Sequence, residues 1–164
     1  MDNIDEIRSL FAQELSSRIR EENLRVSDVA SHCQISVDRL NNYLQGRSFP
    51  NPLILSSIAD FIGFTVNDLL DYDEADEMTL VGYDPLDMFE DEEEFMTHIR
   101  NRMEQCMNDM RIDIAELSEK TGFNTRTIKS WLGMLKRQPS LIRTSDLLKI
   151  CDALCCTPSD LLGY

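Results

Sequence analysis

The chain has 164 residues, of which 42% are hydrophobic and 28% are charged, and its formal net charge is −14. No stretch approaches the ~18 consecutive apolar residues that a membrane span requires, and the acidic start, MDNIDEIRSL, lacks the apolar core of a signal peptide. The five cysteines are odd in number and irregular in spacing, which indicates a reducing cytoplasm rather than a disulfide framework.

The acidity is concentrated in one short segment. Residues 1–72 have 6 basic and 11 acidic side chains, whereas residues 73–95 have 11 acidic side chains and no basic one. Residues 96–164 have 10 basic and 8 acidic side chains. The net charge of the whole chain therefore does not exclude a polyanionic partner for the last part of the sequence.

The pattern of apolar residues occurs twice. With an offset of 88 residues, Phe11 aligns with Ile99 and Tyr43 with Trp131. The offset then grows by four, so that SIADFIGFTVNDLLDY in the first copy aligns with KICDALCCTPSDLLGY in the second. This self-similarity indicates a tandem duplication with a four-residue insertion in the second copy.

Each copy has the spacing of a five-helix bundle. In the first helix of each copy, apolar residues recur every four positions and so share one face: Phe11, Leu15 and Ile19 in one, and Phe95, Ile99, Met103 and Met107 in the other. Caps are expected at the starts of later helices: Ser36, Thr65, Asp113, Asn124 and Thr157. Prolines at 50, 52 and 139 are expected in connections between helices.

Two short helices joined by a tight turn form the helix-turn-helix pattern. The stretch IAELSEKTGFNTRTIKSWLG, with Gly122 in the turn and Trp131 near its end, resembles the lambda repressor and Cro superfamily of XRE-type regulators. The resemblance implies an all-α fold made of a tandem pair of five-helix domains. The expected bounds are residues 1–72 and 91–164, with an acidic linker at residues 73–90.

Departures from the family pattern are also present. The family often has Gln at the second position of the second helix, where it contacts a phosphate, but Val26 and Ile114 stand there. The first copy has Gln34 where a turn glycine is usual. A left-handed backbone at that position is expected to cost a non-glycine residue roughly 1 kcal/mol.

In the second copy, the resemblance implies that the third helix inserts into the major groove of DNA. Arg126 is suited to a guanine edge, and Thr125 and Ser130 can donate or accept hydrogen bonds. The remaining residues expected to contact this DNA are Asn124, Lys129, Lys136, Arg137 and Arg143. The alternative is that these are solvated surface charges on an ordinary bundle.

The corresponding helix of the first copy has side chains that are less suited to contact DNA. Asn42 can pair with adenine and Val37 can contact a thymine methyl group, but Asp38 places a carboxylate in a negative groove. The other expected contacts of this copy are Ser36, Asn41 and Arg47. A role as scaffold or protein-binding surface is favoured for this copy.

The linker has two interpretations. The simpler one is a solvated spacer followed by carboxylates at the start of a helix, where they complement the macrodipole. If its roughly 18 residues are flexible, their r.m.s. span is ~23 Å. Extended, they reach ~60 Å, which allows the two domains to occupy half-sites ~34 Å apart. The alternative is an acidic, partly apolar segment that binds a basic protein partner or covers the basic patch around Arg126.

No catalytic motif occurs in a setting that supports an enzyme. Cys151, Cys155 and Cys156 are interpreted as structural residues, and no metal or cofactor is expected. The sequence thus predicts a cytoplasmic transcriptional regulator of prokaryotic or phage origin whose partner is double-stranded DNA. Its oligomeric state is left open, with a homodimer as one alternative. The alternative hypothesis is an acidic protein-binding module or inhibitor that keeps the fold without binding DNA.

Overall fold

The computed structural model describes residues 4–70, 92–136 and 141–162 of the protein, and in these ranges it is all-helical with no strand. The helices are α1 (Ile4–Glu21), α2 (Val26–His32), α3 (Val37–Leu44), α4 (Pro52–Ile62), α5 (Val66–Leu69), α7 (Glu92–Met110), α8 (Ile114–Thr121), α9 (Thr125–Trp131), α10 (Thr144–Leu154) and α11 (Pro158–Leu162). None of these described helices is both long and apolar enough to cross a bilayer. The predicted linker, residues 73–90, lies outside the described residues, so the domain bounds stay a prediction.

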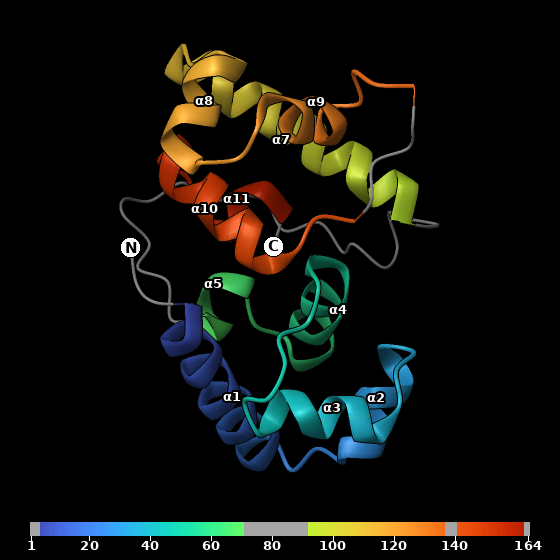
Figure 1. Cartoon of the computed structure of the whole chain (residues 1–164). Coiled ribbons are helices and arrows are strands. Elements are labelled where there is room, and N and C mark those ends of the chain that lie inside the picture. Colours follow the sequence, from blue (N-terminus) through green and yellow to red (C-terminus); the bar gives the residue numbers. More distant parts are fainter. Residues whose placement is uncertain (1–3, 71–91, 137–140, 163–164) are drawn as a thin grey trace.

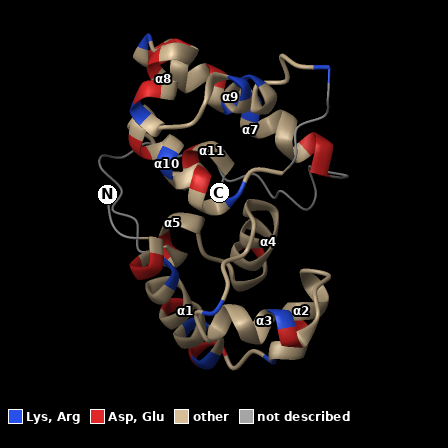
Figure 2. Ribbon diagram, viewed as in Figure 1, with Lys and Arg blue, Asp and Glu red and all other residues tan. Residues whose placement is uncertain are grey.

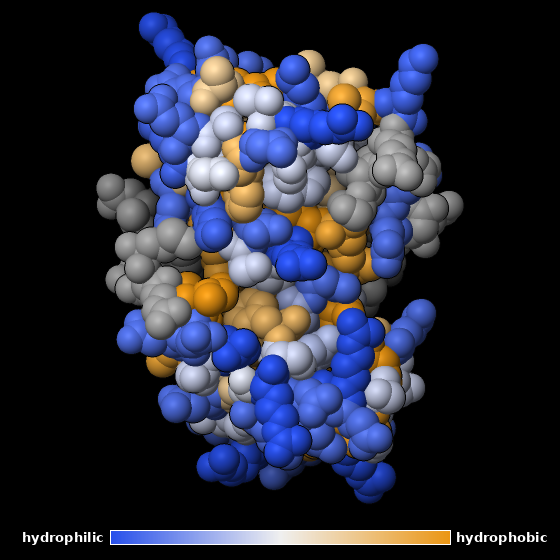
Figure 3. Space-filling view, in the orientation of Figure 1, coloured by the Kyte–Doolittle hydropathy of each residue, from blue (hydrophilic) through white to orange (hydrophobic). Residues whose placement is uncertain are grey.

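The helices at the two ends of the molecule are separated by a central group. Figure 1 shows α2 and α3 at one end and α8 and α9 at the other, with α4, α5, α10 and α11 between them. Hydrophobic residues on the face shown in Figure 3 gather mainly in this middle region. One cluster of buried apolar side chains runs from Phe11 in α1 through to Leu162 in α11. The two halves therefore share a core.

The predicted apolar faces of the two long helices are confirmed. Phe11 and Leu15 in α1, and Phe95, Ile99 and Met103 in α7, are all 0% exposed. Their spacing of four places them on one side of each helix. Removing these apolar side chains from water stabilises the packing of that side. The two long helices are therefore fixed in place by their apolar stripes.

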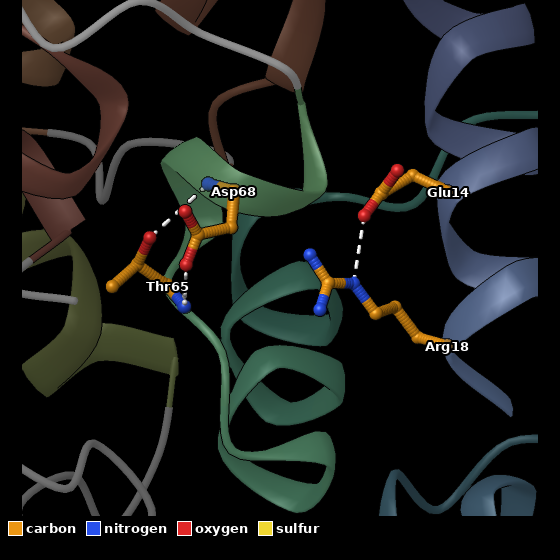
Figure 4. A network of polar contacts seen from close by, with 4 residues as sticks. All are labelled: Glu14, Arg18, Thr65 and Asp68. Carbon is orange, nitrogen blue, oxygen red and sulfur yellow. Dashed lines mark hydrogen bonds and ion pairs between the residues drawn. The ribbon is translucent and has the colours of Figure 1, made fainter. Parts of the chain in front are cut away.

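The predicted caps are also confirmed. The Ser36 hydroxyl accepts from the Arg39 amide at 3.1 Å. Thr65 and Asp68 form a reciprocal capping box at the start of α5, with distances of 3.1 and 3.2 Å. Figure 4 shows this box beside the Glu14–Arg18 ion pair of α1, in which Nε and Oε1 are 2.7 Å apart. Because these caps satisfy amides that have no partner inside the helix, they define where α3 and α5 begin.

One expectation about the connections is wrong. Pro52 does not interrupt the chain before a helix but is itself the first residue of α4, with Asn51 as its cap. The Asn51 side chain accepts from the Ile54 amide at 2.9 Å. Proline is suited to this position because an N–H group in the first turn of a helix has no acceptor within that helix, so its absence costs no hydrogen bond. Pro139 lies outside the described residues.

Left-handed residues occur at matching places in the two halves. The described residues with positive φ form four pairs in order along the chain: Asn23 and Arg111, Gln34 and Gly122, Gly46 and Gly133, and Gly63 and Cys155. Each pair ends the same helix of its half. The predicted strain at the first turn is confirmed, because Gln34 has φ of 56° where the second half has glycine with φ of 81°.

The pair at the helix-helix turn leads to a stability prediction. Gln34→Gly is expected to raise the free energy of unfolding by about 0.5–1 kcal/mol, because glycine relieves a left-handed strain of about 1–2 kcal/mol but has greater freedom in the unfolded chain. Gly122→Ala is expected to lower the free energy of unfolding by about 1 kcal/mol. An added Cβ at Gly122 meets no atom within 4 Å, so this loss reports backbone strain alone.

Chemical denaturation of both variants checks this prediction. Opposite signs are expected for the two substitutions. A loss of stability in Gln34→Gly would contradict the strain argument, since the exposed glutamine side chain would then be contributing more than its backbone costs.

Candidate nucleic-acid interface

The helix-turn-helix of the second half is built by two caps and one glycine. Asp113 caps α8 by accepting from the Glu116 amide at 2.8 Å. Gly122 ends α8 in the left-handed conformation, which lets the chain turn sharply toward α9. Asn124 then caps α9, its Oδ1 accepting from the Thr127 amide at 3.0 Å. The sequence fixes both the end of α8 and the start of α9.

Aromatic packing holds α9 against the rest of its half. Ile128 is 0% exposed and Trp131 is 6% exposed, so one face of α9 points into the core. The Trp131 ring packs edge-on against Phe123 in the turn, with ring centroids 5.1 Å apart. The Lys149 ammonium of α10 lies 5.4 Å from the centroid of the same Phe123 ring. The inner face of α9 is therefore held by the core and by the turn, and its outer face is left for solvent.

The outer face of α9 carries the residues predicted to contact DNA. Asn124, Thr125, Arg126 and Lys129 are exposed, and Ser130 is half-buried. Thr125 and Lys129 also line an open groove between α7, α8 and α9, together with the acidic Glu104 and Asp113. No pattern in the sequence indicates this groove, because its walls come from three separate helices. The groove places carboxylates beside the cationic face.

The rest of the predicted basic patch is spread over the half. Lys136 is exposed a few residues after α9, and Arg137 lies outside the described residues. Arg143 is exposed at the start of α10. The next residue, Thr144, donates its hydroxyl to the carbonyl of Pro50 from the first half, so Arg143 lies at the junction of the halves. Arg126 and Lys129 are therefore the cations that the described part of the structure places on α9 itself.

The corresponding face of α3 is less basic. Val37 is 42% exposed, and Asp38 and Asn42 are exposed on the same helix. Asn41 is half-buried and Ser36 caps the helix. Arg47 is exposed after the helix ends.

Arg39 has a partner inside this half. Its guanidinium lies near the hydroxyl of the buried Tyr43. Burial raises the pKa of Tyr43, and the nearby guanidinium partly opposes that rise. One of the two cations near α3 is therefore engaged with its own domain.

The departures from the family pattern fall at the helix starts. Val26 and Ile114 are the first residues of α2 and α8, and both pack against the core cluster as partly buried side chains. The Asp113 carboxylate accepts from the Glu116 amide at the start of α8. A phosphate at this helix start would therefore meet a carboxylate. Figure 2 shows basic residues on α9 and acidic ones on α8.

The cysteines do not assemble a site in the described residues. Among these residues, no group of three His, Cys, Asp or Glu side chains is placed to hold a metal ion. Burial, with a smaller contribution from Asp60, raises the pKa of the Cys33 thiol to about 12. Hydrogen bonding to Cys156 and burial both raise the pKa of Cys106. Protonated thiols of this kind pack as small apolar groups rather than acting as nucleophiles.

The Asn124 cap leads to a second stability prediction. Asn124→Ala is expected to lower the free energy of unfolding by about 1 kcal/mol, because the Thr127 amide loses its acceptor. Asn124→Ser is the matched control, since serine caps helices about as well as asparagine. Thermal and chemical denaturation of the two variants check the effect. An Asn124→Ala protein as stable as the parent would show that the cap does not contribute.

The second half matches a known protein family. Residues 102–164 match the family model described as the Cro/C1-type HTH DNA-binding domain, a stretch that begins within α7 and includes α8 to α11. These residues contain one Cro/C1-type helix-turn-helix domain. The expected resemblance to the lambda repressor and Cro superfamily is thus confirmed for the second half.

A curated relative agrees with the Cro/C1-type assignment. Over 52 residues the chain is 42% identical to the HTH-type transcriptional regulator DdrOP3 of Deinococcus deserti, a match that covers 32% of this chain. The aligned part spans 40% of the length of that regulator. No solved structure matches the chain.

Proposed function

We propose that the protein is a transcriptional regulator of prokaryotic or phage origin that binds double-stranded DNA in a sequence-specific manner, mainly through α9. The observation on which this rests is that the Cro/C1-type match includes the helix whose exposed face carries Arg126 and Lys129. The name of the Deinococcus deserti relative supports the regulatory role. A cytoplasmic location, without an enzymatic activity or a cofactor, belongs to the same proposal.

Each exposed residue has a role suited to its chemistry. Arg126 donates two hydrogen bonds to the O6 and N7 atoms of a guanine, and Thr125 and Ser130 contact neighbouring base edges or phosphates. Lys129, together with Lys136, Arg137 and Arg143, binds phosphates and so sets the position of the domain on the duplex. The carboxylates of Glu104 and Asp113 in the adjacent groove disfavour close approach of a phosphate there.

The first half is proposed to be a second, weaker helix-turn-helix copy. Four pairs of left-handed residues at matching helix ends support a tandem origin. The capping boxes support it too, since Thr157 and Asp160 repeat the arrangement of Thr65 and Asp68. In this copy Asn42 and Val37 contact bases, with Ser36, Asn41 and Arg47 near the backbone, while Asp38 limits affinity.

Fluorescence anisotropy of a random-sequence duplex, titrated with the full chain, tests the proposal. With three or four phosphate contacts, affinity is expected to fall roughly 40- to 150-fold between ~50 and ~200 mM salt. Selection from the same pool is then expected to enrich a defined sequence. Absence of binding at ~50 mM salt would contradict the proposal.

The rival function predicts that negative result. An acidic protein-binding module or inhibitor would use the carboxylates that the exposed Asp38 and the acidic linker provide. Such a protein would bind a basic protein partner and show no affinity for DNA at any salt concentration. The salt titration therefore separates the two functions in one experiment.

A further inference from the structure

The two halves contact each other through a pair of reciprocal hydrogen bonds. The Asn67 amide donates to the Ser159 hydroxyl oxygen at 3.1 Å, and the Ser159 amide donates to the Asn67 Oδ1 atom at 3.0 Å. The exposed fraction is 3% for Asn67 and 6% for Ser159. In this buried setting an unpaired amide or carbonyl is destabilising, so the two bonds hold α5 and α11 in one relative position.

The contact has the form of a two-fold interface. Asn67 and Ser159 are 92 residues apart, which is the offset that aligns the two copies in this region. Each residue offers its main-chain amide and accepts with its side-chain oxygen, so each plays the same part toward the other. An isologous contact between two identical subunits has this property. Here both sides belong to one chain.

Further burial surrounds this contact. Leu69 and Leu70 in and after α5, and Leu161 and Leu162 in α11, are between 0 and 2% exposed. They too pair at the offset of 92 residues. At a second point, Thr144 at the start of α10 donates its hydroxyl to Pro50, which precedes α4. The halves are therefore packed against each other at both ends of the central helix group.

This packing fixes the two candidate recognition helices relative to each other. Helices α3 and α9 lie at opposite ends of the molecule with the central group between them (Figure 1). We infer that a single chain presents α3 and α9 together to one DNA duplex, as a two-fold-related pair built into one polypeptide. The inference rests on the proposed function, since it requires that α9 binds DNA.

The two half-sites are unequal. A homodimer of helix-turn-helix subunits reads a palindrome, because identical helices face both half-sites. Here α9 exposes Thr125, Arg126 and Lys129, whereas α3 exposes Val37 and Asn42. The duplex for this chain therefore has a guanine-containing block for α9 and a different block, suited to an adenine or a thymine methyl group, for α3.

The first test is selection of duplexes by the full chain, followed by stoichiometry in analytical ultracentrifugation. We expect two different sequence blocks about 10 base pairs apart and one chain per duplex. Asn42→Ala is expected to lower affinity for the selected duplex roughly 5- to 150-fold and to leave affinity unchanged when the α3 block is scrambled. Asn42 is exposed, so this variant keeps its fold.

The second test uses the interface. Inserting five base pairs between the blocks is expected to weaken binding by the parent chain at least tenfold, and the double variant Asn67→Ala with Ser159→Ala is expected to lose less. The control is the double variant Thr65→Ala with Thr157→Ala, which removes the capping hydroxyls of α5 and α11 but leaves the reciprocal bonds. The control is expected to keep the parent's dependence on spacing.

The outcomes separate the inference from the proposed function. A selected sequence with a single block, two chains per duplex, or equal affinity at every spacing would overturn the inference and leave DNA binding by α9 intact. No effect of Asn42→Ala on the selected duplex would do the same. Failure of the full chain to bind any duplex would overturn both.

Discussion

Replacing Arg126 with alanine is expected to weaken specific DNA binding by ~1–3 kcal/mol, which is about 5- to 150-fold, and to relax the choice of base at one position. Arg126 is exposed on α9, in the first turn after the Asn124 cap. Alanine keeps the helix but removes the bidentate donor that distinguishes guanine from the other bases. Anisotropy titrations with the selected duplex and with all three substitutions at the contacted base pair measure both effects.

Two controls sharpen this expectation. Lys120→Ala makes the same change in charge on α8 and is expected to alter affinity little. Lys129→Ala is expected to weaken binding to all sequences about equally and to lower the salt slope by about one unit. If Arg126→Ala bound with the parent's affinity and base preference, the assignment of Arg126 to a base edge would be wrong.

Replacing Trp131 with alanine is expected to lower the free energy of unfolding by ~3–5 kcal/mol. Trp131 is 6% exposed and packs edge-on against Phe123, so the substitution leaves a cavity between α9 and the turn that positions it. Trp131→Phe, which keeps an aromatic ring, is expected to lose much less. The relevant measurement is chemical denaturation followed by far-UV circular dichroism.

Circular dichroism is needed because Trp131 is the chain's one tryptophan, so its fluorescence reports on the parent but not on the variants. A loss of less than 1 kcal/mol in Trp131→Ala would show that the packing of Phe123 and Trp131 does not support α9. DNA binding by the folded fraction of the variant is expected to weaken as well, since the outer face of α9 is positioned by the buried inner face.

Much of the local structure could be predicted from the sequence because it depends on neighbouring residues. The spacing of Phe11 and Leu15 predicts the buried face of α1, and the side chains of Ser36 and Asn124 predict where α3 and α9 begin. Caps and apolar stripes act over one or two turns, so their signals are present in a short window of sequence. The left-handed turn at Gln34 is instead an expectation from the family resemblance, in which a glycine is usual at that position.

The contact between the halves could not be predicted in this way. The sequence alone suggests that the linker sets the spacing of two separate domains. In the structure, Asn67 and Ser159 join the halves directly, although their side chains alone carry no signal that they meet. Contacts between residues 92 apart depend on the packing of whole helices, which the pattern of one segment does not contain.

The position of Arg143 shows the same limit for the candidate site. Its place in a basic loop after α9 suggested a phosphate contact close to Arg126. In the structure it is the residue before α10 and adjoins Thr144, which bonds to the first half. The exposure of Arg126 and Lys129 follows from the period of α9, whereas the position of Arg143 follows from where the connection ends.

Methylation interference at guanine N7, on the duplex selected by the full chain, would decide whether α9 binds in the major groove. N7 lies in the major groove, where a bidentate arginine contact is made. We expect strong interference at one guanine with the parent chain and loss of that interference with Arg126→Ala. The same interference pattern for both proteins, or no interference at any guanine, would contradict it.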